Sequence, residues 1–426
     1  MNLDLAARPF GTDFDGEPGS EASRTTAEPV RVRWPQHEAD EVEAATSVLR
    51  SGRVNSFVHG DQCRAFEAEF AEYCGTPFAI SVANGTVALE LALKALGVGP
   101  GDEVIVPARS FFASTSCVVA IGATPVFADI DPVSQTIDVA SARALVNERT
   151  RAIICVHLAG WPCDMAGLQN VTEDAGIWLV EDCAQAHGAA IDGRRVGSFG
   201  HAAAFSFCTD KIMSTGGEGG MLLLQEEAHW ARAWAYKDHG KDPAKALHPV
   251  AGGAFRYVHD SFGTNFRMTE FQAAIGRVQL RKLPVWLEQR RSNAQTLTRL
   301  LGDHPMIGVP EVPAHVEHSF YKFYFLLNLD LMRTDRSVAE LIMALNAEGV
   351  PASAGSCPDM SREKACQDRQ FGDPSACHNA SEVGRRSVML PVDHLLGEDD
   401  MTRMANAIKS ILVDFTRTPG VTENVQ

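Results

Sequence analysis

The sequence predicts an α/β fold, with a large domain built on a mainly parallel central sheet flanked by helices and a smaller C-terminal α+β domain. Between residues 84 and 225, short apolar runs alternate with longer amphipathic stretches. This alternation is typical of strands joined by covering helices in a parallel sheet. From residue 268 onward the pattern changes to one long helical stretch followed by mixed helices and strands, which indicates a second unit.

Glycine- and proline-rich breaks separate the elements of the alternating region. A first helix is expected from Thr86 to the break at 97–101, and a second helix ends at about Ile121, before Gly122, because glycine commonly ends helices. Apolar runs that are too short for helices lie between the breaks and indicate strands. The expected strands are 104–106, 125–128, 151–158, 177–182 and 201–207.

The C-terminal part begins with the helical stretch 268–301, in which Pro284 marks a kink or a junction. An aromatic and apolar run within 318–330 predicts a strand. Helices are expected near 336–348 and near 399–414, where apolar residues recur with helical spacing.

These patterns predict a large domain at 31–290 and a small domain at 291–415. Residues 1–30 are rich in Gly, Pro, Ser and acidic side chains, a composition typical of a disordered tail. Residues 416–426 are expected to form a short polar tail.

The composition of the chain limits its partners and its location. The 426 residues carry a formal net charge of −16, so neither nucleic acid nor an anionic membrane surface is expected as a partner. No apolar stretch is long enough for a membrane helix. The ten cysteines include no CxxC pair, which favours reduced thiols in a soluble cytoplasmic protein and predicts no metal site.

Polar residues follow several of the expected strands, at the edge of a parallel sheet where ligands bind. Asp182 ends an apolar strand, and Gln185 lies three residues further on. An acid in such a place needs a cation or hydrogen-bond donors as partners. Ser206 lies between Phe205 and Phe207, so strand alternation directs its hydroxyl away from the two rings.

Lys211 follows the strand 201–207 and precedes the glycine-rich segment 216–220, GGEGG. This segment lacks the Lys-Ser/Thr ending of a P-loop and the GxGxxG spacing of a dinucleotide fold. The tripeptide Asn84-Gly85-Thr86 lies at an expected helix start, where free amides and the helix dipole favour an anion such as phosphate.

One cofactor would use all of these features. Pyridoxal 5′-phosphate needs a lysine for its Schiff base, an anion beside its pyridine nitrogen and donors for its phosphate. Phe111, which follows the strand 104–106, is placed to supply a flat surface against the ring. Each feature alone also has a structural interpretation, such as a solvated lysine, a capping aspartate or an ordinary turn. Their joint occurrence in this order favours the cofactor.

With these motifs, the sequence resembles the DegT/DnrJ/EryC1/StrS family of sugar aminotransferases, which belongs to the fold-type I class of pyridoxal-phosphate enzymes. The likeness runs from about residue 32 to 415. The matching segments are NGTVALELALKALGVGPGDEVIVP, GATPVFADIDP, EDCAQAHGA, FSF with Lys211 four residues on, GGEGG and NFRMTEFQAAIGRVQL.

The resemblance implies a role for each matching residue around the cofactor ring. It makes Lys211 the Schiff-base lysine and the proton carrier, and it pairs Asp182 with the pyridine nitrogen. Gln185 would bond the ring hydroxyl, and Phe111 would stack on the ring. Some relatives with a histidine in place of this lysine are sugar dehydratases, so the lysine favours transamination here.

The resemblance also implies how the phosphate is held. Ser206 and the amides of Gly85 and Thr86 would bind it. Asn265 matches an asparagine that reaches the phosphate of the neighbouring subunit, which implies a homodimer with shared active sites.

The activity implied by the resemblance is transfer of an amino group from glutamate or glutamine to a keto or aldehyde sugar. The acceptor would be nucleotide-linked, on a route to amino sugars of cell-surface polysaccharides or secondary metabolites. Two alternatives stay open: a transaminase of a keto-inositol or of an oxidised octulosonate-type sugar acid, and a non-catalytic regulatory relative.

Three further residues are ambiguous in the sequence. Arg109 and Lys322 depart from the residues common in relatives, and each is either a substrate contact or a structural cation. His187 is interpreted as packing beneath the site rather than as a proton donor.

Overall fold

The computed structural model describes residues 29–247, 257–373 and 375–417. The tail expected at 1–30 therefore lies outside the described residues, except for its last two positions. The polar tail expected at 416–426 likewise lies outside them, except for its first two positions.

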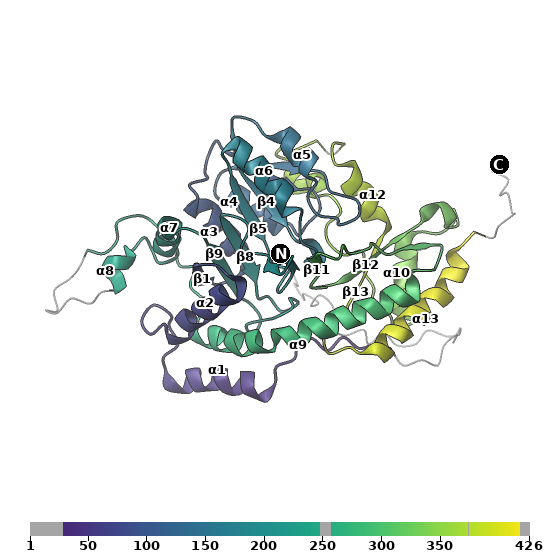
Figure 1. Ribbon diagram of the computed structural model, residues 1–426, viewed down its shortest axis with the longest axis horizontal. Coiled ribbons are helices and arrows are strands. Elements are labelled where there is room, and N and C mark those ends of the chain that lie inside the picture. The colour runs from purple at the N-terminus through teal and green to yellow at the C-terminus, as the bar shows by residue number, and fades with distance from the viewer. Residues whose placement is uncertain (1–28, 248–256, 374, 418–426) are drawn as a thin grey trace, which may run out of the picture.

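A seven-stranded sheet forms the centre of the described part of the chain (Figure 1). Its strands are β1 (Phe78–Val82), β2 (Glu103–Pro107), β3 (Thr124–Ala128), β4 (Thr150–Val156), β5 (Trp178–Asp182), β8 (Ala202–Ser206) and β9 (Gly220–Leu224). In space they follow the order β1-β9-β8-β5-β4-β2-β3. The strands from β8 to β3 are parallel, whereas β9 runs antiparallel to both of its neighbours. The mainly parallel sheet is thus confirmed, and every expected strand is present.

Helices cover both faces of this sheet, because successive residues of each buried strand point to opposite faces and most of them are apolar. Val104 and Val180 face one side, and Phe205 and Leu223 face the other. The helices on the first side are α3 (Gly85–Ala95), α4 (Ala113–Ala120) and α7 (Glu227–Lys237). The helices on the second side are α2 (Asp61–Cys74), α5 (Val139–Leu145), α6 (Met165–Ala175) and α9 (Glu270–Leu301).

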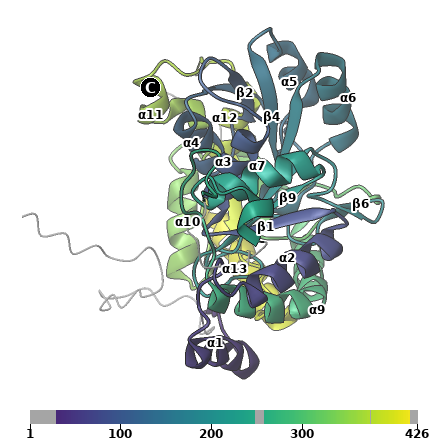
Figure 2. The same cartoon turned by 90° about the vertical axis from the view of Figure 1, so that its left-hand side faces the viewer.

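The long helix α9 connects the two halves of the molecule. It confirms the helix expected at 268–301 and runs without interruption through Pro284, so no junction exists there. Its first half packs on α2 and its second half on α13 (Glu398–Phe415). Figure 1 shows α9 running from beneath the sheet into the C-terminal part, and Figure 2 shows α1 (Ala39–Ser51) on its outer side. The domain division at residue 290, within this helix, stays a prediction.

The C-terminal part has its own small antiparallel sheet and its own apolar core. Its strands are β10 (Ile307–Gly308), β12 (Phe323–Leu327) and β13 (Ser387–Leu390), and the expected helices are present as α10 (Val338–Ala347) and α13. The strand expected within 318–330 is shorter than predicted, because Phe320 has a φ of 45° and so lies outside the extended region.

A third sheet and several short helices complete the described fold. In a third sheet, β11 from the C-terminal part pairs with the hairpin of β6 and β7. The bounds are β6 (Ala190–Ile191), β7 (Arg194–Arg195), β11 (Val316–Glu317), α8 (Pro243–Leu247), α11 (Lys364–Gln367) and α12 (His378–Arg386).

All ten cysteines are free thiols, as the sequence analysis predicted. Within the described ranges, none of the helices combines the length and the apolar character that crossing a bilayer requires. The cytoplasmic location stays a prediction.

The glycine-rich loop between β8 and β9 folds back on itself. The amide of Phe207 donates to the carbonyl of Gly219 at 2.8 Å, which closes the loop next to the strand ends. Gly216 and Gly217 have φ values of 84° and 124°, a region that side chains with a Cβ rarely adopt. The chain therefore turns sharply after Lys211 and returns directly into the sheet.

Where this loop ends, Gly220 lies against the first turn of α3. A Cβ at this position would lie 2.5 Å from the carbonyl oxygen of Asn84. Glycine is therefore needed for the start of α3 to lie beside β9.

We predict that Gly220→Ala destabilises the protein by about 1–3 kcal/mol, the usual result of overpacking against a backbone that cannot move. Gly99→Ala is the matched control, because a Cβ at Gly99 would have no neighbour within 4 Å. Urea unfolding of both variants measures the difference. Equal stability of the two would show that α3 can move away from β9 at no cost.

Candidate active site

A cavity of about 590 Å³ lies at the carboxyl ends of β2, β5 and β8, where ligands bind in parallel sheets. Side chains from the C-terminal part, including Tyr321 and Tyr324, close its other side. Seven of the predicted site residues line this one cavity: Gly85, Thr86, Phe111, Asp182, Gln185, Ser206 and Lys211. Four segments that are distant in sequence, 85–86, 111, 182–185 and 206–211, thus meet as the sequence analysis expected.

The first turn of α3 forms one end of the cavity. Asn84 caps the helix by accepting a hydrogen bond from the amide of Val87 at 3.0 Å. The amides of Gly85 and Thr86 belong to the first turn, where no helical carbonyl is available to accept from them. A Cβ at Gly85 would lie 2.6 Å from the Cβ of Ser206, so only glycine allows the two to be this close. Amides and a hydroxyl together suit a phosphate group.

Asp182 is buried at the end of β5. The Ser114 hydroxyl donates to its Oδ2 at 2.9 Å, and the amide of Ala184 donates to its Oδ1 at 3.1 Å. Burial raises the pKa of this carboxyl, although both hydrogen bonds and the charge of Lys211 act in the opposite direction. Among the described residues no cation forms an ion pair with Asp182, so the cavity offers a buried anion that suits a cationic ring nitrogen.

Lys211 reaches the cavity from the start of the glycine-rich loop. Its Nζ lies 3.7 Å from Asp210 Oδ1 and 5.0 Å from the centre of the Tyr321 ring. The Tyr321 hydroxyl donates to Asp210, and the Trp34 indole donates to the carbonyl of Lys211 at 2.8 Å. The amine is thus held between an anion and an aromatic face while its backbone is fixed from outside.

Gln185 and Phe111 complete the lining in different ways. The Gln185 Oε1 accepts from the amide of Ala159 at 2.7 Å, which orients the side-chain amide. Phe111 is 66% exposed although it follows a buried strand, so its ring is available to a flat ligand.

Asn265 does not line this cavity. It is exposed in the segment that follows α7, where its side chain accepts from the amide of Arg267 at 3.3 Å. Within one subunit, the structure therefore does not bring Asn265 together with the other predicted site residues.

His187 is fully buried beneath the cavity. Its ring packs between Phe205 and Phe207, with ring centres 5.3 and 5.7 Å away, and neither ring nitrogen has a hydrogen-bond partner among the described residues. Burial and the nearby Lys211 lower its pKa to about 3. The packing role expected from the sequence agrees with this environment.

Arg109 is fully buried and does not line the cavity. Its guanidinium donates to Gln135 Oε1 at 3.1 Å and to Ser387 Oγ at 3.0 Å, which ties the end of β2 to β13. Of the two interpretations, the structural one fits this position. Lys322 lies at a second cavity, described below.

Four residues around the cavity were not found in the sequence analysis: Ser114, Asp210, Tyr321 and Trp34. Because Asp210 is adjacent to Lys211 in the chain, the sequence around Lys211 could have indicated it as a site residue. The others come from segments up to 177 residues away from Lys211, and no pattern in the sequence signals their contacts.

A buried polar cluster supports β4 and β5 beneath the cavity. The ligand atoms of His157, Glu181 and Cys183 lie within 4.8 Å of one another. His157 Nε2 lies 3.1 Å from Glu181, its Nδ1 accepts from the amide of Cys163, and Glu181 also accepts amides of the loop 197–200. Because the His157 nitrogens and the Glu181 oxygens are already engaged in hydrogen bonds, these two residues serve to hold the strand ends together.

The donor and acceptor set of the cavity fits pyridoxal phosphate. The open helix start and Ser206 suit its phosphate, the unpaired carboxylate of Asp182 suits its ring nitrogen, and Lys211 suits its aldehyde. Fold and cavity together define a pyridoxal-phosphate-dependent transaminase of fold type I. The chain belongs to the DegT/DnrJ/EryC1/StrS aminotransferase family, whose family model matches residues 35–409.

Individual relatives agree with this assignment. The chain is 36% identical to a UDP-N-acetyl-3-dehydro-alpha-D-glucosamine 3-aminotransferase from Acidithiobacillus ferrooxidans, over 84% of this chain and 90% of that protein. It is also 36% identical to an L-glutamine:2-deoxy-scyllo-inosose aminotransferase from Streptomyces fradiae, over 92% and 96%. An aminotransferase structure from Psychrobacter cryohalolentis superposes with a TM-score of 0.87 at 42% identity, covering 90% of this chain and 99% of that one.

The depressed pKa of His187 predicts a loss of stability in acid. Below its ordinary pKa near 6.5 the imidazole of the unfolded chain takes up a proton that the folded chain refuses down to about pH 3. Acidification within this window therefore favours unfolding, by up to about 1.4 kcal/mol per pH unit for this group.

We predict that His187→Leu, which keeps the packing between Phe205 and Phe207, reduces this dependence on pH. Urea unfolding of wild type and variant at pH 5, 6 and 7 measures it. An unchanged slope would mean that His187 is protonated in the folded protein.

Proposed function

We propose that the protein transfers an amino group from glutamate or glutamine to a keto or aldehyde sugar that is carried on a nucleotide. The product would be an amino sugar for cell-surface polysaccharide or secondary metabolism. One observation carries the proposal: Lys211 and Asp182 line the same cavity as an open helix start. The similar UDP-sugar 3-aminotransferase supports the choice of acceptor.

When bound, pyridoxal phosphate supplies the aldehyde that receives the amino group and an electron sink for the reacting carbon. In this proposal the chain performs the remaining tasks. Lys211, the lysine that lines the cavity, would take the proton from Cα of the amino donor and pass it on to the cofactor carbon. In the second half of the reaction it would move a proton in the reverse direction, to the carbon of the acceptor that receives the amino group. Asp182 keeps the cationic ring nitrogen of the cofactor in place. The amide of Ala159 orients the Gln185 side chain, which leaves the amide nitrogen of Gln185 free to donate a hydrogen bond. The aromatic side chains of Tyr321 and Phe111 limit access of water to the reacting atoms.

A keto-inositol is the second candidate acceptor. The inosose aminotransferase matches the chain at the same identity as the UDP-sugar enzyme and over a larger share of both proteins. An oxidised octulosonate-type sugar acid is a third possibility within the same chemistry. Assay of the purified protein with a panel of carbonyl acceptors separates these three, because only the true acceptor takes the amino group at an appreciable rate.

We also propose a homodimer in which Asn265 reaches the cofactor phosphate of the partner. Asn265 is exposed and lies outside its own cavity, so it is available to a second subunit. Two large apolar side chains in the same segment, Tyr257 and Phe262, are 88% and 98% exposed, as is common where a partner binds.

Lys211→Ala tests the proposed chemistry. We expect the rate of amino transfer to fall by about 10³-fold or more, because the proton carrier is lost, while the fold is retained. Lys364→Ala is the control, since Lys364 pairs with Asp368 at the surface, far along the chain from the cavity. Rates come from the release of 2-oxoglutarate with glutamate as donor, or of 2-oxoglutaramate with glutamine, and circular dichroism checks the fold. A variant with near wild-type turnover would exclude Lys211 as the catalytic lysine.

Subunit mixing tests the shared site. We expect Asn265→Ala to weaken cofactor binding about tenfold, the usual effect of losing one hydrogen bond to a charged group. Co-expression with Lys211→Ala should then restore one intact site in each mixed dimer. Fluorescence titration with pyridoxal phosphate measures this recovery. If no site recovers in mixed dimers, Asn265 does not act across the interface.

A further inference from the structure

Asp210 lies between the proposed catalytic lysine and a tyrosine from the C-terminal part of the chain. Its Oδ1 lies 3.7 Å from the Nζ of Lys211, and the Tyr321 hydroxyl donates to its Oδ2. All three side chains line the cavity at the strand ends. The proposed chemistry uses Lys211 and Asp182 but not Asp210, although an anion beside a proton carrier changes the balance between its two forms.

Tyr321 is held in place through its backbone. Its amide donates to the carbonyl of Ala159 at 2.8 Å, and its carbonyl accepts from the buried guanidinium of Arg290 at 3.2 Å. The residue before it, Phe320, has a φ of 45°, a value that residues other than glycine keep only where their surroundings define it. The tyrosine therefore stands on a sharp and well-defined turn.

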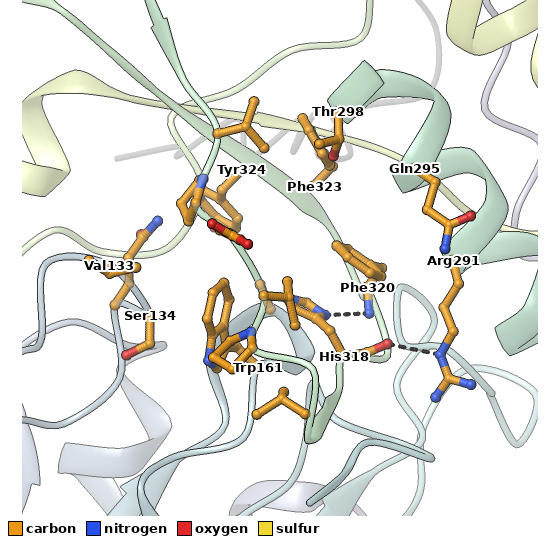
Figure 3. A pocket seen from close by; sticks show the side chains of 18 of the residues that line it. Val133, Ser134, Trp161, Arg291, Gln295, Thr298, His318, Phe320, Phe323 and Tyr324 are labelled. Carbon is orange, nitrogen blue, oxygen red and sulfur yellow. Dashed lines mark hydrogen bonds between the residues drawn. The ribbon is translucent and has the colours of Figure 1, made fainter. Parts of the chain in front are cut away.

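A second cavity, of about 630 Å³, lies on the other side of this turn (Figure 3). Here the His318 ring stacks on the Phe320 ring with a centre distance of 3.9 Å, and its Nδ1 accepts from the Phe320 amide at 2.8 Å. The Arg291 side chain donates to the His318 carbonyl at 3.1 Å, and Figure 3 shows both hydrogen bonds. The turn that carries Tyr321 is thus supported on both sides, and Tyr321 orients Asp210.

The surroundings of Asp210 keep its carboxyl ionised. Partial burial acts to raise its pKa, but the charge of Lys211 and the hydrogen bond from Tyr321 outweigh this and lower the pKa below its ordinary value. Burial and the charge of Asp210 raise the pKa of the Tyr321 phenol, so the phenol keeps its proton. Asp210 therefore presents a negative charge to Lys211 and does not act as a proton donor.

Other ionisable groups also surround the amine of Lys211. Besides Asp210 and Tyr321 they are Asp182, His187, Cys208, Glu218, Tyr324 and, at the second cavity, Lys322. Cys208 and Cys357, which also lines the cavity, keep their protons because burial raises the pKa of both thiols. Within the described ranges, the carboxylate that forms an ion pair with Lys211 is that of Asp210.

A proton carrier alternates between a neutral amine and an ammonium while it moves a proton from one carbon to another. A carboxylate close to the nitrogen stabilises the ammonium. The Tyr321 ring, whose centre lies 5.0 Å from the Nζ of Lys211, acts in the same direction, because the face of an aromatic ring attracts cations. Lys322 opposes both as a like charge, with its Nζ 5.1 Å from the centre of the same ring.

From this geometry we infer that Asp210 is a positioning residue for amino transfer, which holds the amine of Lys211 at the cavity and stabilises its ammonium form while Tyr321 orients the carboxylate. The inference rests on the proposed function, because it takes Lys211 as the proton carrier. The proton that leaves Cα goes to Nζ and from there to the cofactor carbon. Asp210 neither gains nor loses a proton in this transfer.

Asp210→Asn tests the inference, because asparagine keeps the size of the side chain and can still accept from Tyr321 but carries no charge. We expect kcat of the holoenzyme to fall about three- to tenfold, since the lysine becomes a weaker base, with less change in KM for the amino donor. The rise of kcat with pH should move to lower pH by about 0.5–1 unit. This is less than a buried pair produces, because the Asp210 side chain is 56% exposed.

A second measurement needs neither turnover nor cofactor. Acetic anhydride reacts with the neutral form of an amine, and mass spectrometry of the full-length apoprotein follows the labelling of Lys211 against pH, with the surface residue Lys364 as the internal reference. In Asp210→Asn this labelling should begin at lower pH by a similar amount. Asp335→Asn is the matched control, because Asp335 is equally exposed, pairs with Arg333 and does not line the cavity.

The inference is overturned if the pH profile and the labelling of Lys211 are the same in Asp210→Asn as in Asp335→Asn. If Asp210→Asn does not fold, Tyr321→Phe decides, because it keeps the ring and removes only the hydrogen bond that orients Asp210. It should move both curves in the same direction by a smaller amount, and unchanged curves would contradict the inference. Near wild-type turnover of Lys211→Ala would instead exclude the proposed function, whereas the labelling would still report the effect of Asp210 on the amine.

Discussion

The unpaired carboxylate of Asp182 is the constraint on which the arrangement of the cavity depends. A buried anion is costly, and the protein meets this cost with the Ser114 hydroxyl and the Ala184 amide rather than with a cation. Both donors require neighbouring elements, the start of α4 and the turn after β5, to be held in place. The polar cluster of His157 and Glu181 below fixes the same strand ends. A ligand with a positively charged ring nitrogen would supply the cationic partner that Asp182 lacks.

The sequence was sufficient to predict those elements of the fold that depend only on residues close together in the chain. Alternation of apolar runs and Gly/Pro breaks identified the parallel strands, because each strand and each helix signals itself within a few residues. It did not identify β1 or β9. Both are short apolar segments, and their pairing depends on the return of the chain after the glycine-rich loop. Pro284 appeared to be a boundary, yet α9 continues through it, because packing on α2 and α13 outweighs the loss of one hydrogen bond.

The residues around the cavity differ in the same way. Some could be predicted from the nearby sequence, whereas others depend on contacts between segments that are distant in the chain. Lys211, Asp182 and Ser206 could be placed from the sequence because parallel strands bring their carboxyl ends to one edge. The contacts of Tyr321 and Trp34 could not, since they depend on how the C-terminal part and the N-terminal segment close over that edge. The ambiguity of Arg109 is resolved by burial alone, because a guanidinium with no exposed surface that does not line the cavity cannot bind a substrate there.

The hydrogen bond from the Trp34 indole to the carbonyl of Lys211 has a practical consequence. Trp34 is buried against Trp286 and His394, so the peptide of Lys211 is held by a segment ahead of the first helix. Cloning boundaries chosen to start at α1 would remove this hydrogen bond while keeping every residue that lines the cavity. If such a shortened form folds but has a low turnover rate, the lost hydrogen bond from Trp34, a residue outside the cavity, explains the low rate.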